Sequence, residues 1–132
     1  MPVFVDNPAL HSRWYVVAAA DEIGDAPVAV VLLGRPFVLW RDGSDTVRAA
    51  PDRCPHREAP LSCGFIADDT LTCAYHGWRF GGDGRCVEVP SSGPDAAIPP
   101  AAHLRSVPAD ERYGLIWVCP GEPAQPIPAM PW

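Results

Sequence analysis

Prolines and glycines interrupt the whole chain and leave only short apolar runs between them. There are 17 prolines and 11 glycines among the 132 residues, and the longest aliphatic run extends only from Val28 to Leu33. Because both residue types break helices in their interior, this spacing argues against long helices. Short apolar runs bounded by turn residues are typical of strands, so the sequence predicts a turn-rich, all-β protein.

Charge and hydropathy exclude two classes of partner. The chain carries 10 basic and 16 acidic residues, a net charge of −6, and its arginines are scattered, so we expect no nucleic-acid partner. No apolar run approaches the roughly 20 residues that span a bilayer, so we expect no membrane segment. The first residues also lack the basic and apolar regions of a secretory signal, which favours a cytoplasmic location.

The pattern of apolar runs and turn residues predicts the strands and the organisation of the chain. We expect a domain over residues 1–119, followed by an extended proline-rich tail over residues 120–132. Asp110 to Gly114 is expected to be a connection between the last two strands. The expected strands cover residues 13–18, 27–33, 36–41, 46–50, 65–66, 70–73, 79–80, 85–89, 104–107 and 115–119.

Two short segments combine a cysteine with a histidine. They are Cys54-Pro-His56 and Cys73-Ala-Tyr-His76, so each offers one thiolate and one imidazole. If strands bring these loops side by side, they make a four-ligand set of two cysteines and two histidines. The odd number of cysteines, five in all, also favours a metal site over a framework of disulfides.

Three interpretations of this set compete: a zinc ion, a 2Fe-2S cluster and chance. Structural zinc sites usually pair like ligands within one loop, whereas each loop here is mixed. Gly77, Gly64 and Pro55 suit tight loops whose backbone N–H groups approach sulfur, which favours the cluster. Two matched loops make chance the weakest of the three, and the zinc interpretation stays open at this point.

The sequence motifs of both loops resemble those of Rieske 2Fe-2S domains. More narrowly, Cys54-Pro-His-Arg57 and Cys73-Ala-Tyr-His-Gly-Trp78 resemble the N-terminal domain of the large subunit of Rieske non-haem iron, ring-hydroxylating oxygenases. The resemblance covers roughly residues 13–119. It implies a small antiparallel β-sandwich with two cluster-binding loops, in which Cys54 and Cys73 bind one iron and His56 and His76 bind the other. The implied cofactor is a Rieske-type 2Fe-2S cluster.

The resemblance also implies roles for residues beside the ligands and a subtype of cluster. Arg57 could pair with a carboxylate of a partner, and Tyr75 could donate its hydroxyl toward a sulfur. Gly77 allows close backbone approach, and Trp78 would cover the cluster against solvent. Respiratory Rieske proteins have an extra cysteine in each loop, and Ala59 and Tyr75 stand at those places here. The centre is therefore expected to be of the low-potential oxygenase and ferredoxin type.

The chain is not expected to oxygenate a substrate by itself. Oxygen activation in this family uses a separate iron bound by two histidines and a carboxylate, and only His11 and His103 remain once the cluster is built. We therefore predict an electron-relay domain of a Rieske oxygenase, and the alternative is a free-standing Rieske-type ferredoxin. Expected partners are a reductase or ferredoxin as electron donor and a mononuclear iron domain as acceptor, within a possible homotrimer.

The remaining residues of interest receive structural roles. Cys63, Cys86 and Cys119 are expected to be buried small side chains on strands. His11 and His103 are expected to be structural or to face solvent. Trp14, Trp40 and Trp117 are expected to pack from strands. The net charge of −6 would suit docking to a basic patch on a reductase.

Overall fold

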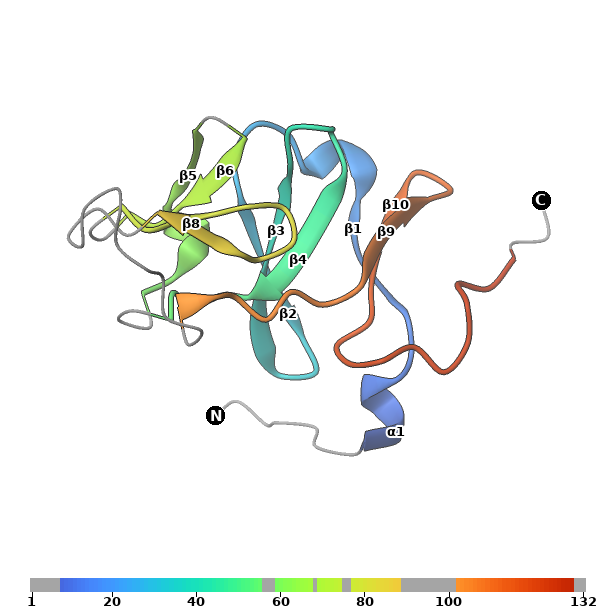
Figure 1. Ribbon diagram of the computed structural model, residues 1–132. Helices are drawn as coiled ribbons and strands as arrows, with labels where there is room; N and C mark the ends of the chain where they lie inside the picture. Colours follow the sequence, from blue (N-terminus) through green and yellow to red (C-terminus); the bar gives the residue numbers. More distant parts are fainter. Residues whose placement is uncertain (1–7, 56–58, 68, 75–76, 89–101, 130–132) are drawn as a thin grey trace.

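Three antiparallel sheets make up nearly all of the regular structure (Figure 1). The computed structural model describes residues 8–55, 59–67, 69–74, 77–88 and 102–129. The sheets have the orders β1-β10-β9, β2-β3-β4 and β5-β6-β7-β8. In chain order the elements are α1 Pro8–His11, β1 Tyr15–Ala19, a 3-10 turn Ala20–Glu22, β2 Val28–Leu32, β3 Arg35–Arg41, β4 Val47–Pro51, a second 3-10 turn Leu61–Cys63, β5 Phe65–Ala67, β6 Thr70–Thr72, β7 Arg79–Phe80, β8 Cys86–Glu88, β9 Ala109–Arg112 and β10 Leu115–Val118.

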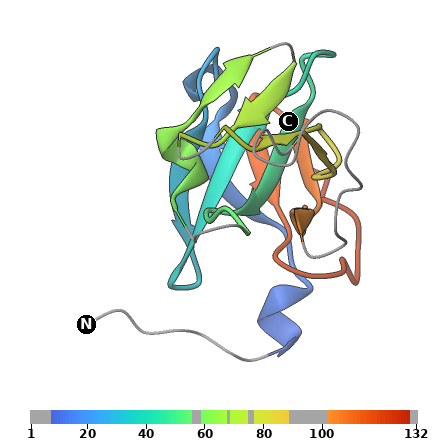
Figure 2. The ribbon, with the colours of Figure 1, turned by 60° about the vertical axis from the view of Figure 1, so that its left-hand side comes forward.

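Strand β3 is buried on both faces and so joins two hydrophobic cores. Successive side chains of a strand point to opposite faces, and four consecutive residues of β3, from Phe37 to Trp40, are buried. Val38 and Trp40 pack in one core with residues of the sheet β5-β6-β7-β8, whereas Phe37 and Leu39 pack in a second core with residues of β10. The sheet β2-β3-β4 therefore lies between the other two (Figures 1 and 2). The predicted all-β, antiparallel class is confirmed.

Two hairpins turn through pairs of residues with positive φ. Leu33 and Gly34 have φ values of 53° and 78°, and Tyr113 and Gly114 have values of 60° and 72°. Two successive left-handed residues match the right-handed twist of the flanking strands. The first of these turns lies one residue earlier than residues 34–35, which separate the strands expected over residues 27–33 and 36–41.

The prediction for residues 104–119 was partly wrong. Residues 109–112 form β9, which pairs with β10 along its whole length and takes in residues 110–112 of the connection expected over residues 110–114. Residues 104–107 form no strand and contribute only a single bridge between Val107 and Ala49. The reason is that β9 is an edge strand exposed at Asp110, Glu111 and Arg112, so it lacks the apolar alternation by which strands are detected.

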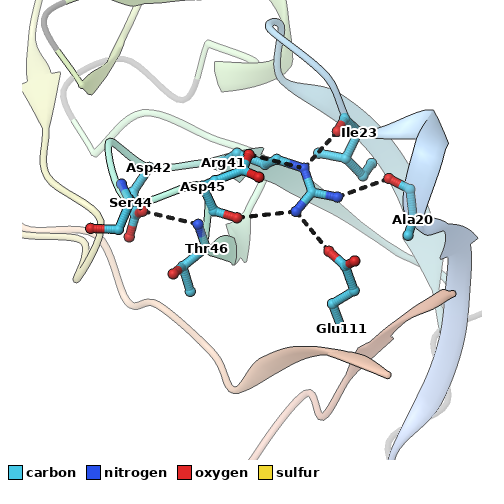
Figure 3. Close-up of polar contacts among 8 residues, drawn as sticks. All are labelled: Ala20, Ile23, Arg41, Asp42, Ser44, Asp45, Thr46 and Glu111. Carbon is cyan, nitrogen blue, oxygen red and sulfur yellow. Dashed lines mark hydrogen bonds and ion pairs between the residues drawn. The ribbon is translucent and has the colours of Figure 1, made fainter. Parts of the chain in front are cut away.

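Arg41, at the end of β3, ties together segments from three parts of the chain (Figure 3). Its guanidinium donates to the backbone oxygens of Ile23 at 2.7 Å and Ala20 at 2.9 Å. The same group donates to Oε1 of Glu111 on β9 at 2.7 Å. Because the Arg41 side chain is only 14% exposed, these contacts hold the first 3-10 turn and β9 against the end of the central sheet.

Asp42 organises the turn between β3 and β4. Its Oδ1 accepts hydrogen bonds from the backbone N–H groups of Ser44 at 2.8 Å and Thr46 at 3.1 Å, and its Oδ2 accepts one from Nε of Arg48 at 2.8 Å. Burial acts to raise the pKa of Asp42, but these three hydrogen bonds together outweigh it, and the pKa lies below its ordinary value. The ionised carboxylate therefore stabilises this turn.

The described part of the proline-rich tail packs against the N-terminal segment. Nε1 of Trp14 donates to the backbone oxygen of Gln125 at 3.0 Å, and the N–H of Ala124 donates to that of Ser12 at 3.0 Å. Ile127 is buried. The tail thus contacts the domain, while the domain boundary after residue 119 remains a prediction.

Two further details concern this region and the helices. Trp14 precedes β1 rather than lying on a strand as predicted. Among the described residues, no helix is long and apolar enough to cross a bilayer.

Candidate metal centre

Both predicted ligand cysteines stand shortly after a strand, at the base of a loop: Cys73 directly follows β6, and Cys54 is the third residue after the end of β4. Cys54 follows β4, and its N–H donates to the backbone oxygen of Ala59 at 2.8 Å. Cys73 follows β6, and its N–H donates to the backbone oxygen of Trp78 at 2.8 Å. Each cysteine therefore closes its loop with a hydrogen bond to the fifth residue after it. This shared backbone geometry was not foreseen, since the two segments differ in the spacing of cysteine and histidine.

The remaining predicted site residues divide between described and undescribed positions. His56, Arg57, Tyr75 and His76 lie outside the described residues. Gly77 has a φ of +69°, a conformation that glycine adopts without strain, and Trp78 packs partly buried against the core that contains both cysteines. Among the described residues, no three His, Cys, Asp or Glu side chains gather closely enough to hold a metal.

The two cysteines share one apolar core. Cys54 and Cys73 are 0% and 1% exposed and belong to the hydrophobic core that also contains Leu61 and Phe80. Thiolates are the ligands of iron–sulfur clusters, and an apolar shell restricts the access of solvent and tunes the potential. The donor chemistry and the surroundings of these two residues fit the cysteine half of a Rieske-type cluster.

Gly64 lies where the segment after the first loop passes against the strand before the second. Its φ of −83° is available to any residue, but a Cβ at this position would lie 2.0 Å from the carbonyl oxygen of Thr72, the residue before Cys73. The segment after the first loop and the strand before the second are therefore in direct backbone contact. A glycine is required here by space, whereas the sequence led us to expect Gly64 in a loop whose N–H groups approach sulfur; its N–H donates to the backbone oxygen of Leu61 at 2.9 Å.

Residues 103–105 lie beside Cys54, a proximity that the sequence did not predict. Nδ1 of His103 accepts a hydrogen bond from the N–H of Cys86 at 2.8 Å, and the N–H of Leu104 donates to the backbone oxygen of Gly84 at 2.8 Å. These bonds hold the segment against the hairpin of β7 and β8. The structural role expected for His103 is confirmed, and since Nδ1 is the acceptor, the neutral ring carries its proton on Nε2.

The other cysteines are placed partly as predicted. Cys86 lies buried on β8, and Cys119 is buried directly after β10. The thiol of Cys119 contacts the backbone oxygen of His11 at 3.3 Å, and burial raises its pKa. Cys63 was predicted to be buried on a strand, which is wrong: it is exposed and ends the 3-10 turn Leu61–Cys63. A single 3-10 turn buries only one of its three residues here, Leu61.

The comparison with protein families decides the identity of the domain. The model of the Rieske [2Fe-2S] domain matches residues 13–108. The chain belongs to the Rieske [2Fe-2S] domain family. Its cofactor is accordingly a Rieske-type 2Fe-2S cluster, and the zinc and chance interpretations are set aside.

Curated relatives of this Rieske domain include oxygenase components. It is 47% identical over 115 residues to the oxygenase component of chloroacetanilide N-alkylformylase from Rhizorhabdus wittichii, covering 87% of this chain and 32% of that protein. It is 41% identical to the oxygenase component of dicamba O-demethylase from Stenotrophomonas maltophilia, covering 87% and 33%. The chloroplastic protein TIC 55 from Arabidopsis thaliana is 39% identical, with coverage of 91% and 23%.

Solved structures agree with the sequence comparison. The crystal structure of apo dicamba monooxygenase superimposes with a TM-score of 0.83 at 40% identity, covering 91% of this chain and 38% of that one. The Rieske domain thus spans about a third of the length of the oxygenase components it matches, in their N-terminal part. These matches support the electron-relay interpretation over a free-standing ferredoxin.

Proposed function

We propose that this Rieske domain relays single electrons to a mononuclear iron domain of an oxygenase, with Cys54, His56, Cys73 and His76 as the ligands of its cluster. The observation that carries the ligand assignment is the matched pair of loops closed by the N–H groups of Cys54 and Cys73. When bound, the cluster supplies a one-electron redox couple.

The described residues account for how such a site is held. The backbone bonds at the bases of both loops fix the positions of the cysteine Cα atoms, and the surrounding core excludes water from the thiolates. Trp78 packs against the same core and is proposed to limit solvent access from the second loop. Arg57 and Tyr75 keep their predicted roles beside the ligands, as part of this proposal.

The partners follow from the kind of protein that the domain matches. Oxygenase components act with reductases or ferredoxins, so the electron donor is of one of these two kinds. We further propose that the acceptor is a mononuclear iron site, reached within a homotrimer of the complete oxygenase. A cytoplasmic location belongs to the same proposal.

The test is metal analysis and electron paramagnetic resonance of the domain purified anaerobically from iron-supplemented cells. We expect two irons and two acid-labile sulfides per chain, and a Rieske-type signal after reduction with dithionite. Cys54→Ser and Cys73→Ser are expected to lose the cluster. The matched controls are Cys86→Ala, a buried cysteine of the same core, and Cys63→Ser, an exposed one; both are expected to retain it.

Two outcomes would contradict this assignment. Stoichiometric zinc without sulfide would exclude the electron-relay function altogether. If Cys86→Ala lost the cluster as completely as Cys54→Ser while remaining folded by circular dichroism, the assignment of the ligands would be wrong.

A further inference from the structure

An open cleft with basic walls lies directly beside Cys54. It has a volume of about 230 Å³, and none of the described residues that line it is acidic. Its two arginines come from segments far apart in the sequence. The lining residues beside Cys54 are Arg53, His103 and Arg105, with Pro51, Pro55 and Leu104. We refer to this feature as the basic cleft.

The local backbone explains why the first wall is basic although an aspartate precedes it. The carboxylate of Asp52 accepts hydrogen bonds from the N–H of Ser62 at 2.8 Å and from its hydroxyl at 2.6 Å. The Asp52 carboxylate therefore binds the second 3-10 turn, while Arg53 lines the cleft and is exposed. Adjacent residues of opposite charge are thus directed to different surroundings.

The second wall is held in place by the hairpin of β7 and β8. The hydrogen bonds from the N–H of Cys86 to Nδ1 of His103 and from the N–H of Leu104 to the backbone oxygen of Gly84 fix the backbone immediately before Arg105. Arg105 is exposed, and no hydrogen bond or ion pair joins its side chain to the rest of the described chain. By contrast, Arg41 and Arg48 are engaged by Glu111 and Asp42.

The charge of the basic cleft is opposite to that of the whole protein. The net charge is −6, but at physiological ionic strength an exposed charge is felt over only about 8 Å. A docking partner therefore responds to the charges that line the contact rather than to the net charge. The basic cleft would attract an acidic surface even though the protein as a whole would repel it weakly at long range.

Building on the proposed function, we propose that the basic cleft is the docking site of an acidic electron-donor protein. The position of the cleft beside Cys54 favours an electron carrier as the partner. Electron transfer slows steeply with distance, and the cleft is adjacent to a proposed ligand of the cluster. The partner's carboxylates would pair with Arg53 and Arg105, and its apolar atoms would cover the prolines and Leu104, giving the mixed polar and apolar contact usual in protein interfaces. One electron leaves the reduced donor and enters the cluster, so the donor is oxidised and the cluster reduced without any bond being made or broken.

The test uses the cluster-loaded chain and a purified acidic plant-type [2Fe–2S] ferredoxin as the probe. Arg105→Glu reverses one charge of the basic cleft, and Arg105→Gln removes it. Arg112→Glu is the matched control, because Arg112 is exposed on β9 and does not line the cleft. Two quantities are measured: the Kd of the complex with oxidised ferredoxin by calorimetry at low salt, and the second-order rate constant of reduction by reduced ferredoxin in stopped flow.

We expect Arg105→Glu to raise the Kd and lower the rate constant by about tenfold or more, and Arg105→Gln to have a smaller effect in the same direction. Arg112→Glu is expected to change both by less than about twofold. Rim charges act mainly on association and its salt dependence, so the difference between the variants is expected to vanish at high salt.

The proposal is overturned if Arg105→Glu and Arg112→Glu weaken the complex equally, since only net charge would then matter. This failure is separable from failure of the proposed function, because dithionite reduces the cluster without docking. If dithionite gives the Rieske-type signal in all variants and ferredoxin does not distinguish them, the docking site alone is refuted. If the wild-type chain holds no cluster, the proposed function itself is refuted, and calorimetry still reports whether the cleft binds ferredoxin.

Discussion

Gly64 is the position at which one added methyl group should disturb the candidate metal centre most directly. It follows the 3-10 turn Leu61–Cys63, and its φ of −83° carries no left-handed strain. A Cβ there would lie 2.0 Å from the carbonyl oxygen of Thr72 and 3.1 Å from that of Leu61. The glycine is needed because the backbone of β6 passes directly against it.

The size of the effect of Gly64→Ala follows from this distance. The contact with Thr72 would be about 1.4 Å shorter than the 3.4 Å at which ordinary contact begins. A Cβ and a carbonyl oxygen cannot rotate away from each other, so the backbones must separate. Overpacking a well-filled region costs about 1–3 kcal/mol, and the loss of unfolded-state entropy returns about 0.4–1 kcal/mol. We expect a net loss of about 2 kcal/mol from a total of about 5–15 kcal/mol.

The assay is urea unfolding followed by tryptophan fluorescence, with two other glycines as controls. At Gly24, a Cβ would meet nothing within 4 Å and φ is not left-handed, so alanine should be neutral or slightly stabilising. At Gly114 space is equally free, but φ is +72°, and the left-handed conformation costs a residue with a side chain about 1–2 kcal/mol. We therefore expect Gly64→Ala to be the least stable, followed by Gly114→Ala and then Gly24→Ala.

A second readout links this position to the cluster. Because Thr72 directly precedes Cys73, separation of the backbones should displace the second loop, and Gly64→Ala should retain less iron and sulfide than Gly114→Ala. If Gly64→Ala matches Gly24→Ala to within about 0.5 kcal/mol, the argument from backbone contact is refuted.

Three further substitutions test other parts of the structure. Arg41→Met removes charged hydrogen bonds to two backbone oxygens and should lower the free energy of unfolding by about 2–4 kcal/mol; a loss below about 0.5 kcal/mol in urea unfolding would show that solvent replaces these bonds. Asp42→Asn should weaken the protein at pH 7 and flatten its acid sensitivity: the pKa of Asp42 is lowered by folding, so its contribution is present above about pH 4, the ordinary range, and is lost as pH falls through the folded-state value. Unfolding midpoints at pH 3, 5 and 7 measure this, and parallel pH profiles of the variant and wild type would contradict it. Ile127→Ala, which truncates a buried side chain of the tail, should cost about 2 kcal/mol, whereas the exposed Gln125→Ala should change stability by less than about 0.5 kcal/mol; equal thermal midpoints for the two would mean that the tail does not stabilise the domain.

The sequence predicted the strands best where their pattern is local. A strand was expected over residues 36–41, which contain the apolar run Phe37 to Trp40, and β3 covers residues 35–41. The neighbouring strands expected over residues 79–80 and 85–89 are also present as the antiparallel pair β7 and β8. Such features depend on a few neighbouring residues, whose turn geometry and burial are set by their own side chains.

Edge positions and single turns were predicted less well. Most of strand β9 was expected to be part of a connection, because Asp110, Glu111 and Arg112 are all polar and exposed, and only the pairing with β10 makes the segment a strand. Cys63 was expected to be buried, but a 3-10 turn presents it to solvent. In both cases the deciding contact is with a segment that the local pattern does not contain.

The all-β class and the Rieske character of the domain could be predicted from the sequence alone. Turn residues indicate the first and the motifs of two short loops indicate the second, and both signals lie within a few neighbouring residues. Only the tertiary structure decided that β3 separates two cores, that Gly64 lies against Thr72, and that Arg53 and Arg105 line one cleft beside Cys54. These contacts join segments far apart in the chain. They arise from the packing of the three sheets, whose relative placement depends on the burial of all their faces at once and is not written in any single segment.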